Sequence, residues 1–174
     1  MNIAGLDLST KSSGWSVFSD GNLIKYGCIT AGSANLFNRI DKMIVELEPI
    51  IIENQIQHVY IEDVYPEDVK NNQAVFNALK YLQGFVLHLL NKHNLKYTFF
   101  TASEWRAKCG IHTGRGIKRD SLKPKDIAFV KNQFNIQVND DIADAICIGW
   151  AGLGEKPKVT EIETIITEDG FEFK

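Results

Sequence analysis

One carboxylate interrupts an otherwise apolar stretch near the start of the chain. Residues Ile3 to Leu8 predict a short buried strand, because they are almost entirely apolar and are followed by small turn-forming residues. Asp7 lies inside this strand, and an ionised carboxylate is costly to bury unless it is paired, hydrogen-bonded or bound to a metal ion. Asp7 is therefore either a capping or turn residue at the strand end or part of a functional site. Three further acids in similar settings favour the functional site.

The order of the elements after this strand predicts a mixed α/β layer fold. Two apolar runs, Gly14 to Phe18 and Leu23 to Thr30, flank Ser19-Asp-Gly-Asn22, a strong hairpin signal because Gly and Asn tolerate positive φ. With the first strand these runs form an antiparallel meander. Helices then alternate with two more strands, which crossovers would add to the same sheet. The predicted helices are 33–55, 71–93, 104–108, 123–134 and 139–150, and the two further strands are 58–65 and 96–101.

Capping and turn chemistry predicts several boundaries of these elements. Ser33 and Ser103 are expected to cap the helices that follow them, and Asp140 is expected to cap the last helix. Pro49 is expected to kink the first helix or end it early. The second helix carries a wider apolar surface than one sheet face requires, so it serves either core packing alone or core packing and a dimer interface.

Composition indicates a cytosolic globular protein. Apolar residues make up 44% and charged residues 24% of the 174 residues, and no signal peptide or bilayer-spanning run is visible. The three cysteines and four histidines are scattered without disulfide or metal-ligand spacing, which argues against a zinc site. We expect one domain over residues 1–152 and a C-terminal extension, 153–174, that forms a hairpin. The expected location is the cytoplasm, or the host cytoplasm if the protein is phage-encoded.

Positive charge is concentrated in one segment of an acidic chain. The net charge is −3, yet the segment Arg106 to Lys131 holds eight basic residues and only two acidic ones. Such a segment is either a solvated basic loop or a face that meets the phosphates of a nucleic acid.

The four acids that stand out share the surroundings expected of a metal site. Glu62 and Asp63 are adjacent in a predicted strand, so they point to opposite faces and only one of them shares a face with a neighbouring strand's acid. Asp141 and Asp144 are three residues apart in the last helix and lie on one face, where two like charges need a cation nearby. The alternative is a pair of acids favoured by the start of a helix. Oxygen ligands without His or Cys suit Mg²⁺ or Mn²⁺, and several carboxylates hold two such ions for phosphoryl transfer.

Three stretches together resemble the RuvC-type Holliday-junction resolvases of the ribonuclease H-like superfamily, nearest to its phage-borne branch. They are Gly5-Leu-Asp-Leu-Ser9, Ile61-Glu-Asp-Val-Tyr65 and Asp141-Ile-Ala-Asp-Ala145, within a resemblance that runs from about residue 2 to 152. The fold it implies is a ribonuclease H-like α/β fold, with a mixed five-stranded sheet flanked by helices. The activity it implies is metal-dependent cleavage of four-way junctions and other branched DNA by a homodimer that makes paired nicks.

The resemblance also implies roles for individual residues. Asp7, Glu62, Asp141 and Asp144 would bind the metal ions, Mg²⁺ or Mn²⁺, with two per active site, and Lys123 would lie near the scissile phosphate. Tyr65 matches an aromatic that stacks on unpaired bases, although a structural tyrosine at a strand end is an equally good interpretation. The residues expected to contact DNA are Tyr65, Arg106, Arg115, Lys118, Arg119, Lys123 and Lys125. The long basic loop and the C-terminal segment depart from bacterial relatives and predict weaker sequence selectivity.

Three alternatives compete with this interpretation. The first strand also resembles the phosphate-binding hairpin of sugar kinases and actin-like ATPases, but this chain is short and lacks their second phosphate loop. A ribonuclease H-like nuclease acting on RNA–DNA hybrids would use the same acids. A non-catalytic subunit that binds branched DNA would gain nothing from acids clustered near phosphate.

Overall fold

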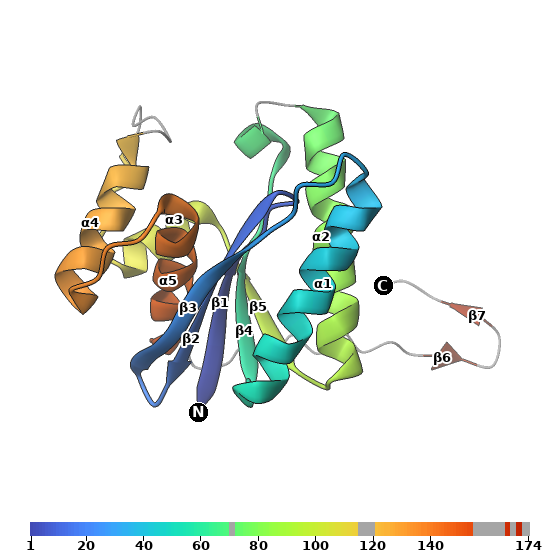
Figure 1. The fold of residues 1–174 in the computed structure, drawn as a ribbon, viewed down its shortest axis with the longest axis horizontal. Coiled ribbons are helices and arrows are strands. Elements are labelled where there is room, and N and C mark those ends of the chain that lie inside the picture. The colour runs from blue at the N-terminus through green and yellow to red at the C-terminus, as the bar shows by residue number, and fades with distance from the viewer. Residues whose placement is uncertain (70–71, 115–120, 155–165, 168–169, 172–174) are drawn as a thin grey trace.

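A five-stranded mixed sheet forms the centre of the protein (Figure 1). The structure is a computed structural model and describes residues 1–69, 72–114, 121–154, 166–167 and 170–171. The strand order is β3-β2-β1-β4-β5; β1 pairs antiparallel with β2 and parallel with β4. This is the predicted meander extended by crossover strands, so the predicted fold class is confirmed. The strands are β1 (Asn2–Asp7), β2 (Ser12–Ser19), β3 (Asn22–Thr30), β4 (His58–Glu62) and β5 (Lys96–Phe100).

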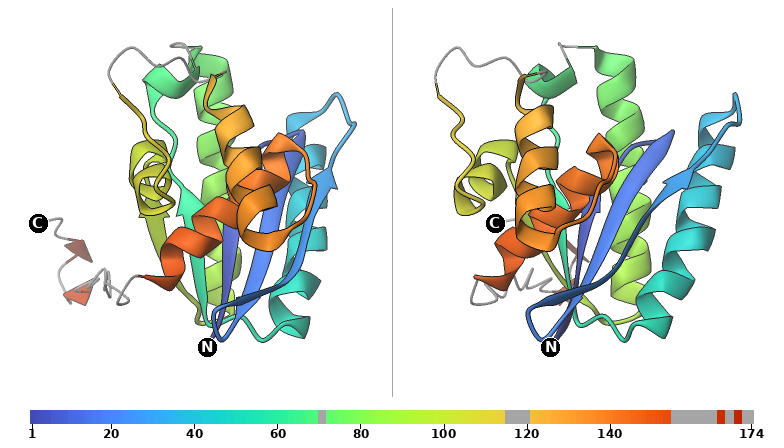
Figure 2. Two further views of the ribbon diagram at one scale, coloured as in Figure 1. Left: turned by 90° about the vertical axis from the view of Figure 1, so that its left-hand side faces the viewer. Right: turned by 60° about the vertical axis from the view of Figure 1, so that its left-hand side comes forward.

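Helices cover both faces of this sheet (Figures 1 and 2). On one face lie α1 (Leu36–Glu53) and α2 (Gln73–Lys92). On the other lie α3 (Ala102–Lys108), α4 (Lys123–Phe134) and α5 (Asp140–Leu153). A short 3₁₀ helix, η1 (Pro66–Val69), follows β4. Each face has its own apolar core, because alternate residues of a buried strand point to opposite sides.

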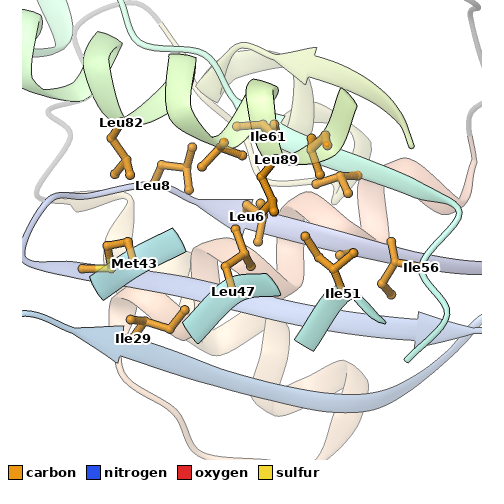
Figure 3. Packing of buried hydrophobic residues seen from close by; sticks show 14 of the residues in the cluster. Leu6, Leu8, Ile29, Met43, Leu47, Ile51, Ile56, Ile61, Leu82 and Leu89 are labelled. Atoms are coloured by element: carbon orange, nitrogen blue, oxygen red, sulfur yellow. The ribbon is translucent and has the colours of Figure 1, made fainter. Parts of the chain in front are cut away.

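The core between the sheet and the first two helices is made of aliphatic side chains (Figure 3). Leu6 of β1 and Leu8, which follows the strand, pack with residues of α1 and α2: Met43, Leu47 and Leu82. Residues 43 and 47 are four apart, so they lie on the same side of their helix. This packing leaves the opposite face of β1, which carries Asp7, for α5.

The predicted hairpin between the second and third strands is present. Asp20 and Gly21 both have positive φ, at 49° and 86°, as expected for a two-residue turn that matches the twist of the strands.

The structure corrects several predicted boundaries. The first helix is capped by Asn35, whose side chain accepts from the backbone N–H of Phe37, and not by Ser33. Thr101 caps α3 in a capping box with Glu104, so the cap lies two residues before Ser103. Asn139 caps α5, which makes Asp140 its first helical residue.

Two further boundaries also differ from expectation. Helix α1 continues through Pro49 to Glu53, so the proline does not end it early, and the expected kink stays a prediction. The fourth strand ends at Glu62, three residues before the predicted end at Tyr65. Residues after Glu62 turn away because Pro66 begins η1.

Near the C-terminus, β6 (Ile166–Thr167) pairs antiparallel with β7 (Gly170–Phe171). Most of the extension in which the hairpin is expected, 153–174, lies outside the described residues. Within the part of the chain that is described, none of the helices combines the length and the apolar character needed to cross a membrane.

Candidate active site

The first and fourth strands place two acids side by side. Leu6 pairs with Ile61 in the parallel register of β1 and β4, so Asp7 and Glu62 are the next residues along each strand. Both belong to the sheet face on which α5 packs, since Ile3 and Tyr60 of the same alternation lie in that core.

Asp63 points to the opposite face of the sheet from Glu62, as the sequence predicts. Its carboxylate forms a 2.7 Å ion pair with Lys80 of α2 and accepts a hydrogen bond from Tyr65. These partners hold the pKa of Asp63 below its usual value against the effect of burial. Asp63 therefore lies apart from the other acids and is not a candidate metal ligand.

Close packing of α5 on the sheet brings the second pair of acids to Asp7. Gly14 is the partner of Asp7 in the β1–β2 ladder, and a Cβ at position 14 would collide with the Asp141 backbone carbonyl. Gly5 similarly leaves room for the backbone of Gly149. Because only glycine permits this approach, α5 packs closely against β1 and β2 near the end of β1, where Asp7 lies. The Ser12 hydroxyl then donates a hydrogen bond to Oδ2 of Asp141.

Asp144 lies in an unfavourable electrostatic environment for a carboxylate. Its side chain is buried, with a relative exposure of 5%, and its Oδ1 has no hydrogen-bond partner among the described residues. Burial and the negative charges of Asp7, Asp126 and Glu62 raise the pKa of Asp144 to about 9, and Arg106 opposes them only in part. Without a cation, the proton is the species that neutralises this carboxylate.

A buried ion pair between Arg106 and Asp126 lies next to Asp144. Arg106 is 2% exposed, and its Nε and Nη2 donate to the Asp126 carboxylate at 2.8 to 3.2 Å. The same Nη2 lies 3.9 Å from Oδ2 of Asp144. Arg106 was expected to contact DNA; its burial leaves no surface for a phosphate, so that expectation is corrected.

Glu62 is held by an aromatic donor from α3. The indole Nε1 of Trp105 donates a 2.8 Å hydrogen bond to Oε2 of Glu62, and both side chains are buried. The backbone carbonyl of Glu62 also accepts from Gln83 of α2. Two consecutive residues of one short helix, Trp105 and Arg106, thus contact or approach two of the four acids.

An open cavity of about 670 Å³ gives access to this cluster. Asp7, Asp141 and Asp144 line it, while Glu62 lies outside its lining. Across the cavity, apolar residues from α1 and α2, among them Leu36, Val75 and Leu79, form a wall. Lys123, the first residue of α4, also lines the cavity, and its ammonium forms an ion pair with Asp140. This pair raises the pKa of Lys123 and lowers that of Asp140.

Of the other residues expected to contact DNA, two are exposed and three lie outside the described part of the chain. Lys125 is exposed on α4, and Tyr65 is 45% exposed between β4 and η1. Arg115, Lys118 and Arg119 lie outside the described residues. Lys11 and Arg39, which the sequence did not single out, line the cavity; Arg39 donates to the backbone carbonyls of residues 10, 33 and 34.

The donor set fits hard divalent cations. The cluster offers only carboxylate oxygens, and one buried oxygen of Asp144 lacks a hydrogen-bond partner among the described residues. In the described part of the chain, no three acidic, histidine or cysteine side chains are already grouped closely enough to hold one ion. Two of the four carboxylates already accept a hydrogen bond from a side chain, Glu62 from Trp105 and Asp141 from Ser12.

Sequence reasoning missed Ser12, Trp105 and Asp126. Asp126 had a usable signal, because it shares a helical face with the apolar Val130 four residues later. An acid on such a face has to be paired, and Arg106 is the buried base that pairs with it. Ser12 and Trp105 carry no local signal, since their partners are distant in the sequence.

Comparison with known proteins matches the chain to one family. The model of the family "Crossover junction endodeoxyribonuclease RuvC" matches residues 3–151. A protein of that name from Ehrlichia ruminantium is 29% identical over 159 residues, covering 85% of this chain and 93% of the relative.

Two solved structures share the fold at low sequence identity. RuvC of T. thermophilus in complex with a Holliday junction substrate superposes with a TM-score of 0.71 at 12% identity, covering 88% of this chain and 93% of that one. The yeast mitochondrial Holliday junction resolvase Ydc2 gives 0.54 at 12% identity, covering 86% and 78%. Because the family model spans most of the sequence, including all four acids, the chain belongs to the RuvC family of crossover junction endodeoxyribonucleases.

Proposed function

We propose that this protein is a metal-dependent endonuclease that cleaves four-way DNA junctions with paired nicks. The observation that carries the proposal is one cavity lined by Asp7, Asp141, Asp144 and Lys123 in a chain of the crossover junction endodeoxyribonuclease family. Acids alone would repel a phosphodiester, so their purpose there is to bind cations.

Each acid has a distinct part in binding the metal. Asp7 and Asp141 reach the cavity from a strand end and a helix start. Asp144 supplies a buried oxygen that accepts no hydrogen bond from the described residues. Glu62, which does not line the cavity, is the fourth ligand and is oriented by a hydrogen bond from the indole of Trp105. Bound Mg²⁺ or Mn²⁺, two ions in our proposal, would activate a water molecule and stabilise charge on the leaving oxygen.

Basic residues position the DNA backbone in this proposal. The Lys123 ammonium lies at the cavity edge and binds the phosphate next to the cleaved bond, leaving its pair with Asp140 when it does so. Lys125 supplies a further phosphate contact, and Arg115, Lys118 and Arg119, which lie outside the described residues, would supply others. Exposed Tyr65 stacks on an unpaired base at the crossover, with its hydroxyl restrained by Asp63.

Two cuts require two such sites, and a homodimer supplies them. The exposed aromatic rings of Phe37, Tyr81 and Phe85 lie on α1 and α2, where Phe37 and Tyr81 stack with centroids 6.3 Å apart. Large exposed apolar side chains grouped in this way mark an interaction surface. We assign this surface to a second copy of the chain.

The decisive experiment compares three substrates with the same protein preparation. A synthetic four-way junction, a linear duplex and an RNA–DNA hybrid are incubated with Mg²⁺, with Mn²⁺ and with chelator. Paired, metal-dependent nicks confined to the junction support the proposal. Preferential cutting of the hybrid would reassign the protein to ribonuclease activity, and tight junction binding without cutting in either metal would leave a binding subunit as the better account.

A further inference from the structure

We propose that Asp126 is a positioning residue, which holds the Arg106 guanidinium away from Asp144 and thereby leaves the Asp144 carboxylate to the metal ion. This inference rests on the proposed function, since it concerns how one of the proposed metal ligands is kept available. It assigns a role to a buried pair that neither enters the cavity nor contacts DNA.

The geometry shows one buried cation between two buried acids. Three hydrogen bonds join the guanidinium to Asp126: Nε lies 3.2 and 3.1 Å from the two carboxylate oxygens, and Nη2 lies 2.8 Å from one of them. The same Nη2 is 3.9 Å from Oδ2 of Asp144, beyond hydrogen-bond distance. The Arg106 guanidinium is therefore hydrogen-bonded to Asp126, whereas it only lies near Asp144.

The two acids compete for Arg106 because all three side chains are removed from water. Arg106 is 2%, Asp126 0% and Asp144 5% exposed. A buried guanidinium needs a carboxylate partner, and the planar fork favours the acid that it can bind with two nitrogens. A shift of about 1 Å would bring Nη2 to normal hydrogen-bond distance from Asp144. Without the negative charge of Asp126, Asp144 becomes the nearest partner.

Neighbouring contacts limit how the guanidinium can move. Its carbon lies 4.0 Å from the centre of the Trp105 ring, and the Trp105 indole is fixed in turn on Glu62. The backbone carbonyl of Arg106 accepts from Ile111, which anchors the end of α3. An arginine held in this way rotates toward Asp144 more easily than it leaves the interior.

The resulting arrangement separates charge neutralisation from metal binding. Arg106 and Asp126 cancel one another, so four acids remain to attract divalent cations. If Arg106 were paired directly with Asp144, a guanidinium would cover the oxygen Oδ2 and oppose the approach of a cation. Asp126 prevents this loss without contacting the metal itself.

A pair of variants tests the inference on the full chain without DNA. Asp126→Asn keeps the shape and removes the charge, and Mn²⁺ affinity is measured by electron paramagnetic resonance titration. We expect binding about 10–100-fold weaker than wild type, the range for loss of groups that support metal ligands. The double variant Arg106→Gln/Asp126→Asn has no cation to release onto Asp144, so its affinity should return to within about threefold of wild type.

Glu48→Gln is the matched control, because Glu48 pairs with Lys92 and His93 on the other face of the sheet. Its Mn²⁺ affinity should equal that of wild type. Circular dichroism and a thermal melt show that each variant is folded before its titration is interpreted.

Two outcomes overturn the inference while the proposed function stands. One is Asp126→Asn binding Mn²⁺ as tightly as a wild-type protein that also cuts junctions. The other is a folded double variant that binds Mn²⁺ as weakly as Asp126→Asn. The ion pair of Arg106 and Asp126 would then support the structure of the site, and would not act by keeping Arg106 away from Asp144. If Asp126→Asn does not fold, a folded double variant that binds Mn²⁺ far more weakly than wild type still overturns the inference. A wild-type protein that binds no Mn²⁺ and cuts no junction would overturn the proposed function itself.

Discussion

Gly14 lies opposite Asp7 in the β1–β2 ladder, and the backbone carbonyl of Asp141 fills the space that a side chain at position 14 would need. The absence of a side chain at Gly14 on β2 thus determines how closely α5 approaches Asp7 on β1. The same contact lets Ser12, two residues before Gly14, donate to the Asp141 carboxylate. Helix packing and the geometry of the acid cluster are therefore set by the same few atoms.

Gly14→Ala should damage both stability and cleavage. The added methyl group has to displace the backbone of α5, and overpacking of this kind costs about 1–3 kcal/mol of unfolding free energy. The displacement also moves Asp141 away from Asp7, so the junction cleavage rate should fall further than the loss of folded protein explains. Urea unfolding and single-turnover cleavage measure the two effects. Gly32→Ala is the control, since a Cβ there meets no atom within 4 Å; equal behaviour of the two variants would contradict the packing argument.

Asp7→Asn should abolish cleavage and preserve junction binding. The substitution removes a proposed metal ligand at the cavity, and a loss of more than about 100-fold in rate is expected, because groups that only support ligands already cost 10–100-fold. Binding should be unchanged or tighter, since a negative charge near phosphate is removed. A gel-shift titration and a cleavage time course on one labelled junction give both numbers. Asp41→Asn, at an exposed position of α1, serves as the control; retained cleavage by Asp7→Asn would rule out the proposed metal ligand set.

Local patterns in the sequence predict the fold and the four acids because each of those features is encoded within a few residues. The alternation around Asp7 and Glu62, the hairpin signal at residues 19–22 and the spacing of Asp141 and Asp144 are all local. The fold order then assigns them to strand ends and a helix start on one side of the sheet, which the structure confirms.

The supporting layer could not be predicted because it depends on contacts between distant segments. Trp105 reaches Glu62 across 43 positions and Arg106 reaches Asp126 across 20. Arg106 shows the consequence most clearly: as one of eight basic residues in its segment it indicated a DNA contact, yet the fold buries it. Charge counted along a sequence does not distinguish an exposed base from a paired one. The predictions that Ser33 and Ser103 cap helices were wrong for a related reason. Asn35 and Thr101 lie two residues away in the sequence and are equally good capping residues.

Trp105→Phe should weaken both metal binding and the fold. Phenylalanine retains most of the buried ring but loses the donor to Oε2 of Glu62, and the carboxylate is then free to rotate. We expect Mn²⁺ affinity to fall about tenfold, and the free energy of unfolding to fall by about 1.5–3 kcal/mol, as for other hydrogen bonds to charged groups. Calorimetric Mn²⁺ titration and urea unfolding measure these changes. Trp150→Phe, on the outer part of α5, should leave Mn²⁺ affinity at the wild-type value; an equal loss in both variants would refute the positioning of Glu62 by Trp105.

Stability of the metal-free protein should fall as the pH rises. The pKa of Asp144 is raised from 3.8 to about 9 in the fold, so between these values the folded chain holds a proton that the unfolded chain has released. Unfolding then releases that proton and is favoured by higher pH across this window. Metal binding displaces the same proton, so Mn²⁺ affinity should rise with pH over the same range. Thermal melts in chelator at pH 6 and pH 8.5 check the first statement. Asp144→Asn should lose this part of the pH dependence; a melting temperature that changes equally in wild type and variant would contradict the assignment.

Phe85→Glu should convert the protein to a monomer that makes single nicks. Phe85 is 47% exposed on α2 in the apolar surface that we assign to the second copy, and burying a carboxylate there without a partner is costly. Each chain contributes one acid cluster in its described residues, so a monomer meets only one strand of a junction at a time. Sedimentation velocity gives the assembly state, and a supercoiled plasmid with an extruded cruciform distinguishes nicked circles from linear product. Ile24→Glu, at a similarly exposed apolar position on β3, should remain dimeric and produce linear plasmid. If Phe85→Glu also remained dimeric, the interface would have to lie elsewhere on the molecule, whereas a monomer that still makes paired cuts would show that one site serves both strands in succession.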